Sequence, residues 1–245
     1  MSLELAAGEW LAITGPNGCG KTTLALAVSG LWPVTRGRVE VDGAWLPPTP
    51  AGRAAARLAT VLQEPSSQLF ERTVADEIAF APRNLGVGDA ELQAGVSEWS
   101  ARLGLTELRG HAPHSLSAGW QQRVLLAGAL ASGPRVLVVD EGTAHLDAAA
   151  RERVLGVVRE QVSRGLAVLW ITQHPAECAA ADRVYAMGAD GTLAPPGERR
   201  GLPERVTGAG SSVAHPVPLR AGSGGLIVRI DPDGRGAGRS VRTTR

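Results

Sequence analysis

One short stretch, Gly15–Thr22, constrains the fold of this chain more than any other. It has the sequence Gly-Pro-Asn-Gly-Cys-Gly-Lys-Thr and follows the apolar run 10–13, which is typical of a buried strand. The run 23–28 that comes next is typical of a helix. Glycines at this spacing let backbone N–H groups turn inward, and a helix beginning here adds the positive end of its dipole. The pattern predicts a strand, an anion-binding loop and a helix in succession.

Lys21 indicates which kind of anion this loop binds. Lysine and arginine together number 25, and Lys21 is the only lysine. A compact ammonium suits the β- and γ-phosphates of a nucleotide, whereas a forked guanidinium does not fit a closed loop. The Thr22 hydroxyl is a ligand for Mg²⁺. We therefore predict a nucleotide-binding loop made of Gly15, Pro16, Asn17, Gly18, Cys19, Gly20, Lys21, Thr22 and Thr23.

Length and composition exclude several classes of protein. The chain has 245 residues, of which 44% are hydrophobic, enough for one large domain or two small ones. No run approaches the roughly 18 apolar residues that span a bilayer, and the first residues lack the pattern of a signal peptide. The two cysteines, Cys19 and Cys178, form no disulfide framework, which favours a reducing cytosol.

The remaining patterns predict a layered α/β fold. Continuous apolar runs at 58–62, 135–139 and 166–171 are typical of strands buried in a parallel sheet. Helices are expected at about 117–131 and, with Asp147 as N-cap, up to about 163. Alternating residues at 38–46 predict a hairpin. We expect a P-loop NTPase (RecA-like) core with a mainly parallel sheet and a β-hairpin subdomain.

Two further segments differ from this core. Residues 65 to about 115 are rich in prolines, charges and short amphipathic patterns, which predicts a helical insertion subdomain with helices at 74–80, 89–103 and 106–108. We assign residues 1–198 to one nucleotide-binding domain and 199–245 to a loose Gly/Arg/Pro-rich tail, in which 226–230 resembles a strand. The tail carries excess arginine but lacks interleaved aromatic residues, so no nucleic acid partner is expected.

Two acids and a small-residue turn complete the candidate site. Asp140 and Glu141 end an apolar strand, where Asp140 can join Thr22 around Mg²⁺ and Glu141 can orient or deprotonate an attacking water. The segment 116–119, Leu-Ser-Ala-Gly, is typical of a helix N-terminus with Ser117 as cap, which is a second place for an anion.

In order, these motifs resemble those of the ATP-binding cassette (ABC) ATPase family over residues 3 to about 190. The set consists of the phosphate loop, Gln63 after a strand, Leu116–Gly119, Asp140–Glu141 with Asp147, and a strand end at 172–174. The segments 62–70 and 79–86 resemble the branch of energy-coupling factor and cobalt/nickel importers. The resemblance implies an ATPase that uses ATP and Mg²⁺ and energises import of a vitamin or a transition-metal ion.

The resemblance also implies that two chains share each site. ATP would lie between the phosphate loop of one cassette and the signature of a second, identical or related, cassette. The signature residues here are Ser117, Ala118, Gly119 and Trp120. Gln63 would reach Mg²⁺ or the attacking water, and Asp147 would lie at the dimer seam. The helical insertion would receive integral membrane subunits, which places the chain peripherally on the cytoplasmic face of the membrane.

Three departures from the family pattern leave alternatives open. No aromatic residue precedes the phosphate loop at the distance expected for stacking on adenine, and we expect the N-terminus to be truncated. Ala118 and Trp120 replace the usual glycine and glutamine of the signature. At the position of the switch histidine, counting gives Gln173, with His174 one residue later, so both remain candidates as catalytic residues beside Glu141 and Gln63.

Two other functions compete with the importer. One is a soluble ABC-type ATPase in DNA repair or translation, although such chains usually carry tandem cassettes, coiled-coil arms or zinc insertions. The other is a degenerate module that binds ATP with little turnover, which Trp120 and Gln173 motivate.

Overall fold

A six-stranded sheet forms the centre of the computed structural model, which describes residues 2–34, 37–41, 44–45, 57–194 and 226–229. The strand order is β5-β6-β7-β2-β8-β9, and only the last pairing, β8 with β9, is antiparallel. The strands are β2 (Trp10–Thr14), β5 (Leu58–Val61), β6 (Val136–Asp140), β7 (Ala167–Ile171), β8 (Arg183–Met187) and β9 (Leu193–Ala194). The predicted mainly parallel α/β core is confirmed.

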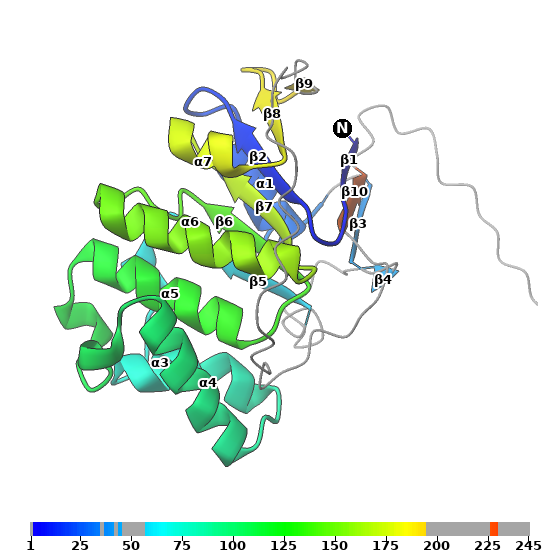
Figure 1. Ribbon diagram of the computed structural model, residues 1–245. Coiled ribbons are helices and arrows are strands. Elements are labelled where there is room, and N and C mark those ends of the chain that lie inside the picture. Colours follow the sequence, from blue (N-terminus) through cyan, green and yellow to red (C-terminus); the bar gives the residue numbers. More distant parts are fainter. Residues whose placement is uncertain (1, 35–36, 42–43, 46–56, 195–225, 230–245) are drawn as a thin grey trace, which may run out of the picture.

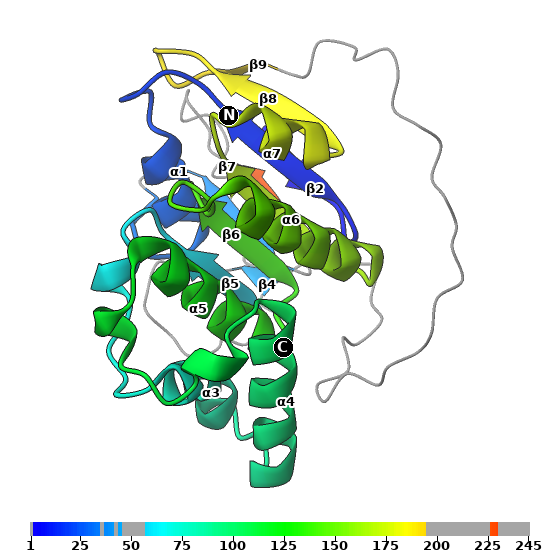
Figure 2. The ribbon, with the colours of Figure 1, turned by 60° about the vertical axis from the view of Figure 1, so that its left-hand side comes forward.

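Helices cover both faces of this sheet, as Figures 1 and 2 show. In β2, Trp10 and Ala12 join the core beneath α5 (Ala118–Ala131) and α6 (Ala148–Ser163), whereas Leu11 and Ile13 join the core beneath α1 (Lys21–Val28). Successive strand residues point to opposite faces, so a continuous apolar run is buried on both. The short helix α7 (Pro175–Ala180) lies beside α6.

A smaller antiparallel sheet contains strands from distant parts of the sequence. Its order is β1-β10-β3-β4, with β1 (Ser2–Leu5), β3 (Arg38–Val41), β4 (Ala44–Trp45) and β10 (Leu226–Arg229). The predicted hairpin is present as β3 and β4. β10 pairs antiparallel with β1 and β3, so the run of the tail that resembles a strand forms one and belongs to a sheet. The rest of the tail lies outside the described residues.

The insertion is helical, as predicted, but its elements differ in detail. It contains the 3₁₀ turn η1 (Pro65–Ser67), the helices α3 (Val74–Asn84) and α4 (Asp89–Arg102), and the 3₁₀ turns η2 (Thr106–Leu108) and η3 (Pro113–Ser115). α3 continues beyond its predicted end at Phe80, through the buried Pro82. Within the described residues, no helix combines the length and apolar character needed to cross a membrane.

The turn after β6 is closely packed around Gly142. A Cβ atom at this position would lie 2.2 Å from Cγ1 of Val139 and 3.0 Å from Cζ2 of Trp170. Trp170 is fully buried, and its indole N–H donates to Oε2 of Glu177 at 2.6 Å. The Val139 methyl group and the indole of Trp170 therefore occupy the space that a side chain at position 142 would need.

This packing predicts opposite effects of two glycine-to-alanine substitutions. We expect Gly142→Ala to lower the free energy of unfolding by about 1–3 kcal/mol, because the added methyl group overpacks the core. Gly156 lies within α6, and a Cβ atom there would meet nothing within 4 Å, so Gly156→Ala should raise stability by about 0.5–1 kcal/mol. Urea unfolding of both variants checks this, and equal stability of the two would contradict it.

Candidate nucleotide site

The phosphate loop lies between β2 and α1, with a left-handed glycine at its end. Gly20 has a φ of 103° and precedes the first residue of α1, Lys21. Lys21 is only 7% exposed, and its ammonium donates hydrogen bonds to the carbonyl oxygens of Gly15 at 2.8 Å and Pro16 at 2.9 Å. The lysine side chain is therefore held by the backbone of its own loop.

An open cavity of about 690 Å³ collects most of the predicted site residues. It lies at the carboxyl ends of β2, β5, β6 and β7, the edge at which open α/β sheets bind ligands. The predicted residues that line it are Asn17, Gly18, Gly20, Lys21, Thr22, Thr23, Gln63, Asp140, Glu141, Gln173 and His174. None of the four signature residues is among those that line it.

Asp140 has the surroundings of a metal ligand. It is 1% exposed, and its Oδ2 atom has no hydrogen-bond partner among the described residues. Burial raises the pKa of this carboxyl above its usual range, while a hydrogen bond from Thr22 and the charge of Lys21 act in the opposite direction. A buried carboxylate oxygen without a partner, beside a threonine hydroxyl, supplies the hard oxygen ligands that Mg²⁺ takes. These residues fit the ion.

Glu141 has an unusual backbone conformation. Its φ of 53° makes it the one non-glycine residue with positive φ in the described part of the chain, and such a conformation costs about 1–3 kcal/mol. Its carboxylate Oε2 accepts a hydrogen bond from Nε2 of Gln63 at 3.1 Å. The fold therefore brings together two predicted catalytic residues that lie far apart in the sequence.

The two switch candidates have different environments. Gln173 donates from Nε2 to Oδ1 of Asn17, in the phosphate loop, at 2.7 Å. His174 is the N-cap of α7, and its Nδ1 accepts from the backbone N–H of Ala176 at 3.2 Å. Both residues line the cavity, but only the glutamine contacts the phosphate loop through its side chain, which favours Gln173 as the residue that faces a bound nucleotide.

The signature lies at the start of α5, away from this chain's own cavity. Ser117 is the N-cap of α5, as predicted, although its side chain makes no capping hydrogen bond. A Cβ atom at Gly119 would lie 2.6 Å from the carbonyl oxygen of His145, so the helix approaches the turn before α6 closely. Trp120 stacks against Arg123, with the guanidinium carbon 3.4 Å from the ring centroid. Asp147 caps α6 by accepting from the N–H of Ala150 at 2.7 Å.

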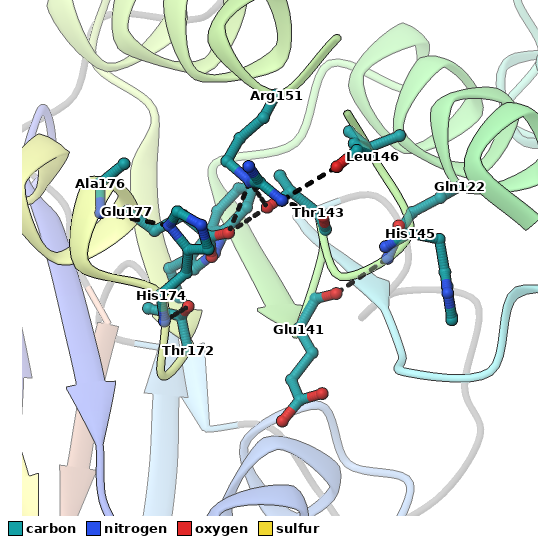
Figure 3. A network of polar contacts seen from close by, with 11 residues as sticks. Gln122, Glu141, Thr143, His145, Leu146, Arg151, Thr172, His174, Ala176 and Glu177 are labelled. Atoms are coloured by element: carbon teal, nitrogen blue, oxygen red, sulfur yellow. Dashed lines mark hydrogen bonds and ion pairs between the residues drawn. The ribbon is translucent and has the colours of Figure 1, made fainter. Parts of the chain in front are cut away.

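A mostly buried polar network in the wall of the cavity, which includes the lining residues Arg151 and Glu177, was not predicted from the sequence (Figure 3). Glu177, 2% exposed, accepts hydrogen bonds from Thr143 and Trp170 and forms an ion pair with Arg151 at 3.8 Å. Arg151 also donates to the carbonyl oxygen of Leu146 at 2.9 Å. An acid and an arginine on two helices resemble ordinary surface residues, so no sequence pattern points to this network.

Taken together, the fold and the site define a class of protein, the P-loop nucleotide-binding proteins. A phosphate loop after a central parallel strand and an acid pair at the end of a neighbouring strand are its distinguishing features. Within this class, the chain belongs to the ABC transporter family, because a model of that family matches residues 1–144. The predicted family, the P-loop NTPase fold and the prediction of an ABC-type ATPase are confirmed.

Individual relatives point to one branch of the family. The chain is 39% identical over 194 residues to the energy-coupling factor transporter ATP-binding protein EcfA1 of Levilactobacillus brevis, with 79% of this chain and 69% of the relative covered. It is 38% identical to the cobalt import ATP-binding protein CbiO of Rhodobacter capsulatus, with 89% and 79% covered. Neither relative supports the alternative in DNA repair or translation.

Solved structures agree on the fold. cbiO1 of Clostridium perfringens, described as part of the ABC transporter complex cbiONQ, is 29% identical with a TM-score of 0.64 over 75% of each chain. The ABC transporter cassette MJ0796, in a dimeric structure, is 23% identical with a TM-score of 0.74, covering 82% of this chain and 89% of that one. The second likeness concerns the fold alone.

The fit of Asp140 to Mg²⁺ predicts a metal-dependent change in stability. With ATP present, saturating Mg²⁺ at 100 times its Kd should stabilise the wild type by about 2.7 kcal/mol, or roughly 5–10 °C in Tm. Asp140→Asn should lose this increment, because an amide supplies no charge to the ion. Thermal unfolding with ATP and Mg²⁺ measures it, and ATP without Mg²⁺ is the control. An unchanged increment in the variant would contradict the assignment.

Proposed function

We propose that this chain is the ATP-binding and ATP-hydrolysing subunit of an energy-coupling-factor type importer. One observation carries the proposal: the phosphate loop, Gln63, Asp140, Glu141 and Gln173 line a single cavity. The relative named for cobalt import supports a transition-metal ion as cargo, and a vitamin is the other cargo that the resemblance to energy-coupling factor importers implies. The chain would bind peripherally at the cytoplasmic face of the membrane.

The residues that line the cavity would have different roles in ATP hydrolysis. The Lys21 ammonium, now bonded to the carbonyl oxygens of Gly15 and Pro16, is placed to exchange these partners for phosphate oxygens. Thr22 and Asp140, with Gln63 nearby, would hold Mg²⁺, which neutralises charge on the phosphates. Glu141 would orient the attacking water and accept its proton, and the hydrogen bond from Gln63 would fix its carboxylate.

The site needs a second cassette to be complete. Ser117 and Gly119 lie outside this chain's own cavity, at the N-terminal end of a helix, which favours anions. In a head-to-tail pair, identical or related, they would contact the γ-phosphate bound to the partner, and Asp147 would lie at the seam. Binding of ATP would close the pair and hydrolysis would open it. The cassette MJ0796, which has the same fold, is dimeric in a solved structure.

A groove beside the helical insertion is the proposed docking place for membrane subunits. It has a volume of about 250 Å³ and lies between β5, α3 and α5, with Phe70 and Phe80 packed edge to face at its side, 59% and 37% exposed. Gln68, which also lines it, bonds both backbone groups of Leu62 at 3.0 and 3.1 Å. Leu62 precedes Gln63, whose side chain bonds the carboxylate of Glu141, so a displacement of Gln68 in the groove can shift Glu141 through two residues.

Turnover tests the enzymatic part of the proposal. Glu141→Gln should lower kcat for ATP at least about 100-fold, because an amide cannot accept a proton, while ATP binding remains. Phosphate release by the purified chain together with its membrane subunits gives the rate, and a fluorescent ATP analogue gives the affinity. If wild type and variant both bind ATP and turn it over at the same negligible rate, the chain is instead the degenerate nucleotide-binding module.

Co-purification tests the docking groove. Phe70→Ser removes an exposed ring from the groove and should reduce recovery of the membrane subunits with this chain at least about tenfold, as expected for an interface anchor. Leu85→Ser is the matched control, since Leu85 is 38% exposed in the same insertion but does not line the groove. Equal recovery with the two variants would place the interface elsewhere.

A further inference from the structure

The left-handed backbone of Glu141 requires something to hold it. Its N–H donates to the carbonyl oxygen of Ile171 at 2.9 Å, and its own carbonyl oxygen accepts from the N–H of Ala144 at 3.1 Å. A third bond comes from outside the turn: Nε2 of Gln122 donates to the same carbonyl oxygen at 2.8 Å. Residues keep such a conformation only where their surroundings over-determine it.

Gln122 spans the turn that follows Glu141. Its Oε1 accepts from the N–H of His145 at 3.4 Å, so one side-chain amide joins the two ends of the segment from Glu141 to His145. Gln122 is completely buried, and Figure 3 shows its amide reaching this turn from α5. A buried amide with both its donor and its acceptor engaged has little freedom to change partners.

The other side of the same turn is fixed by the network around Glu177. Arg151 donates to the carbonyl oxygen of Leu146 and, from Nε, to the hydroxyl of Thr143 at 3.2 Å, while Glu177 bonds both Thr143 and Arg151. The turn is therefore held at its centre and at its far end. Because Thr143 and Leu146 are fixed in this way, the turn cannot move as a whole when Gln122 is displaced. The displacement therefore changes the position of Glu141.

Gln122 lies on the same helix as the signature. Ser117 caps α5, and Gln122 follows within its first two turns. We propose that Gln122 is a positioning residue, which couples contact between the signature and the partner's nucleotide to the placement of Glu141 for hydrolysis. This inference rests on the proposed function, since it requires a signature that engages ATP on a second cassette.

Substitution by methionine, which keeps the length of the side chain and removes both hydrogen bonds, tests the inference. Gln122→Met should lower kcat for ATP about tenfold with KM within about twofold, because Glu141 is misplaced while the phosphate loop is untouched. Gln121→Met is the matched control: the neighbouring glutamine is 7% exposed and donates to the carbonyl oxygen of Pro113, away from the turn. The control should keep kcat within about twofold of wild type.

A double variant distinguishes a role of Gln122 in positioning Glu141 from a general loss of protein stability. In Glu141→Gln, the residual single-turnover rate should change less than about twofold when Gln122→Met is added, because the group that Gln122 positions is already disabled. Gln122→Asn, with its amide one methylene further from the turn, replaces the methionine variant if that variant does not fold. Equal factors of loss in both backgrounds, or equal loss in the Gln121 and Gln122 variants, would overturn the inference. Absence of turnover in the wild type would instead refute the proposed function.

Discussion

The position of β2 in the middle of the parallel sheet is the constraint on which the rest of this molecule depends. β2 pairs in parallel with β7 on one side and β8 on the other, and β7 continues the sheet to β6 and β5. Because all these strands run in the same direction, their carboxyl ends meet at one edge. The phosphate loop, Gln63, Asp140 and Gln173 each follow or end one of these strands, so residues distant in sequence share a single cavity. The register of the sheet thereby sets the composition of the site.

Within that cavity, the buried ionisable groups Asp140 and Lys21 are placed where a bound ligand can supply partners of opposite charge. Asp140 is held in a place where burial raises its pKa and so disfavours its ionised form, and one of its oxygens has no hydrogen-bond partner among the described residues. The Lys21 ammonium is bonded to two carbonyl oxygens of its own loop. Both groups gain from a ligand that brings negative phosphates together with a cation. Asp140 and Lys21 therefore make the site less stable without a ligand and favour binding of Mg²⁺ with a nucleotide.

Much of this could be predicted from the sequence, for physical reasons. Continuous apolar runs predicted strands buried on both faces, and the spacing of the phosphate loop predicted what binds there. Counting could not separate Gln173 from His174, because a strand end shifts by one residue, whereas their contacts distinguish them. The pairing of β10 with β1 and β3 was equally inaccessible, since these partners lie near the opposite end of the sequence. Gln122 offered no signal, because a glutamine in a helix is usually exposed and its role here comes from burial.

The isolation of Lys21 has a chemical consequence. It is the only lysine of the chain, and it lies 7% exposed within the loop that would hold the phosphates. Amine-directed acylation of a side chain can therefore happen at one place only, the nucleotide site itself. The mass of the peptide that contains Lys21 would then show whether that site was open to reagent or shielded by its ligand. Acylation of Lys21 can therefore report whether a ligand occupies the nucleotide site.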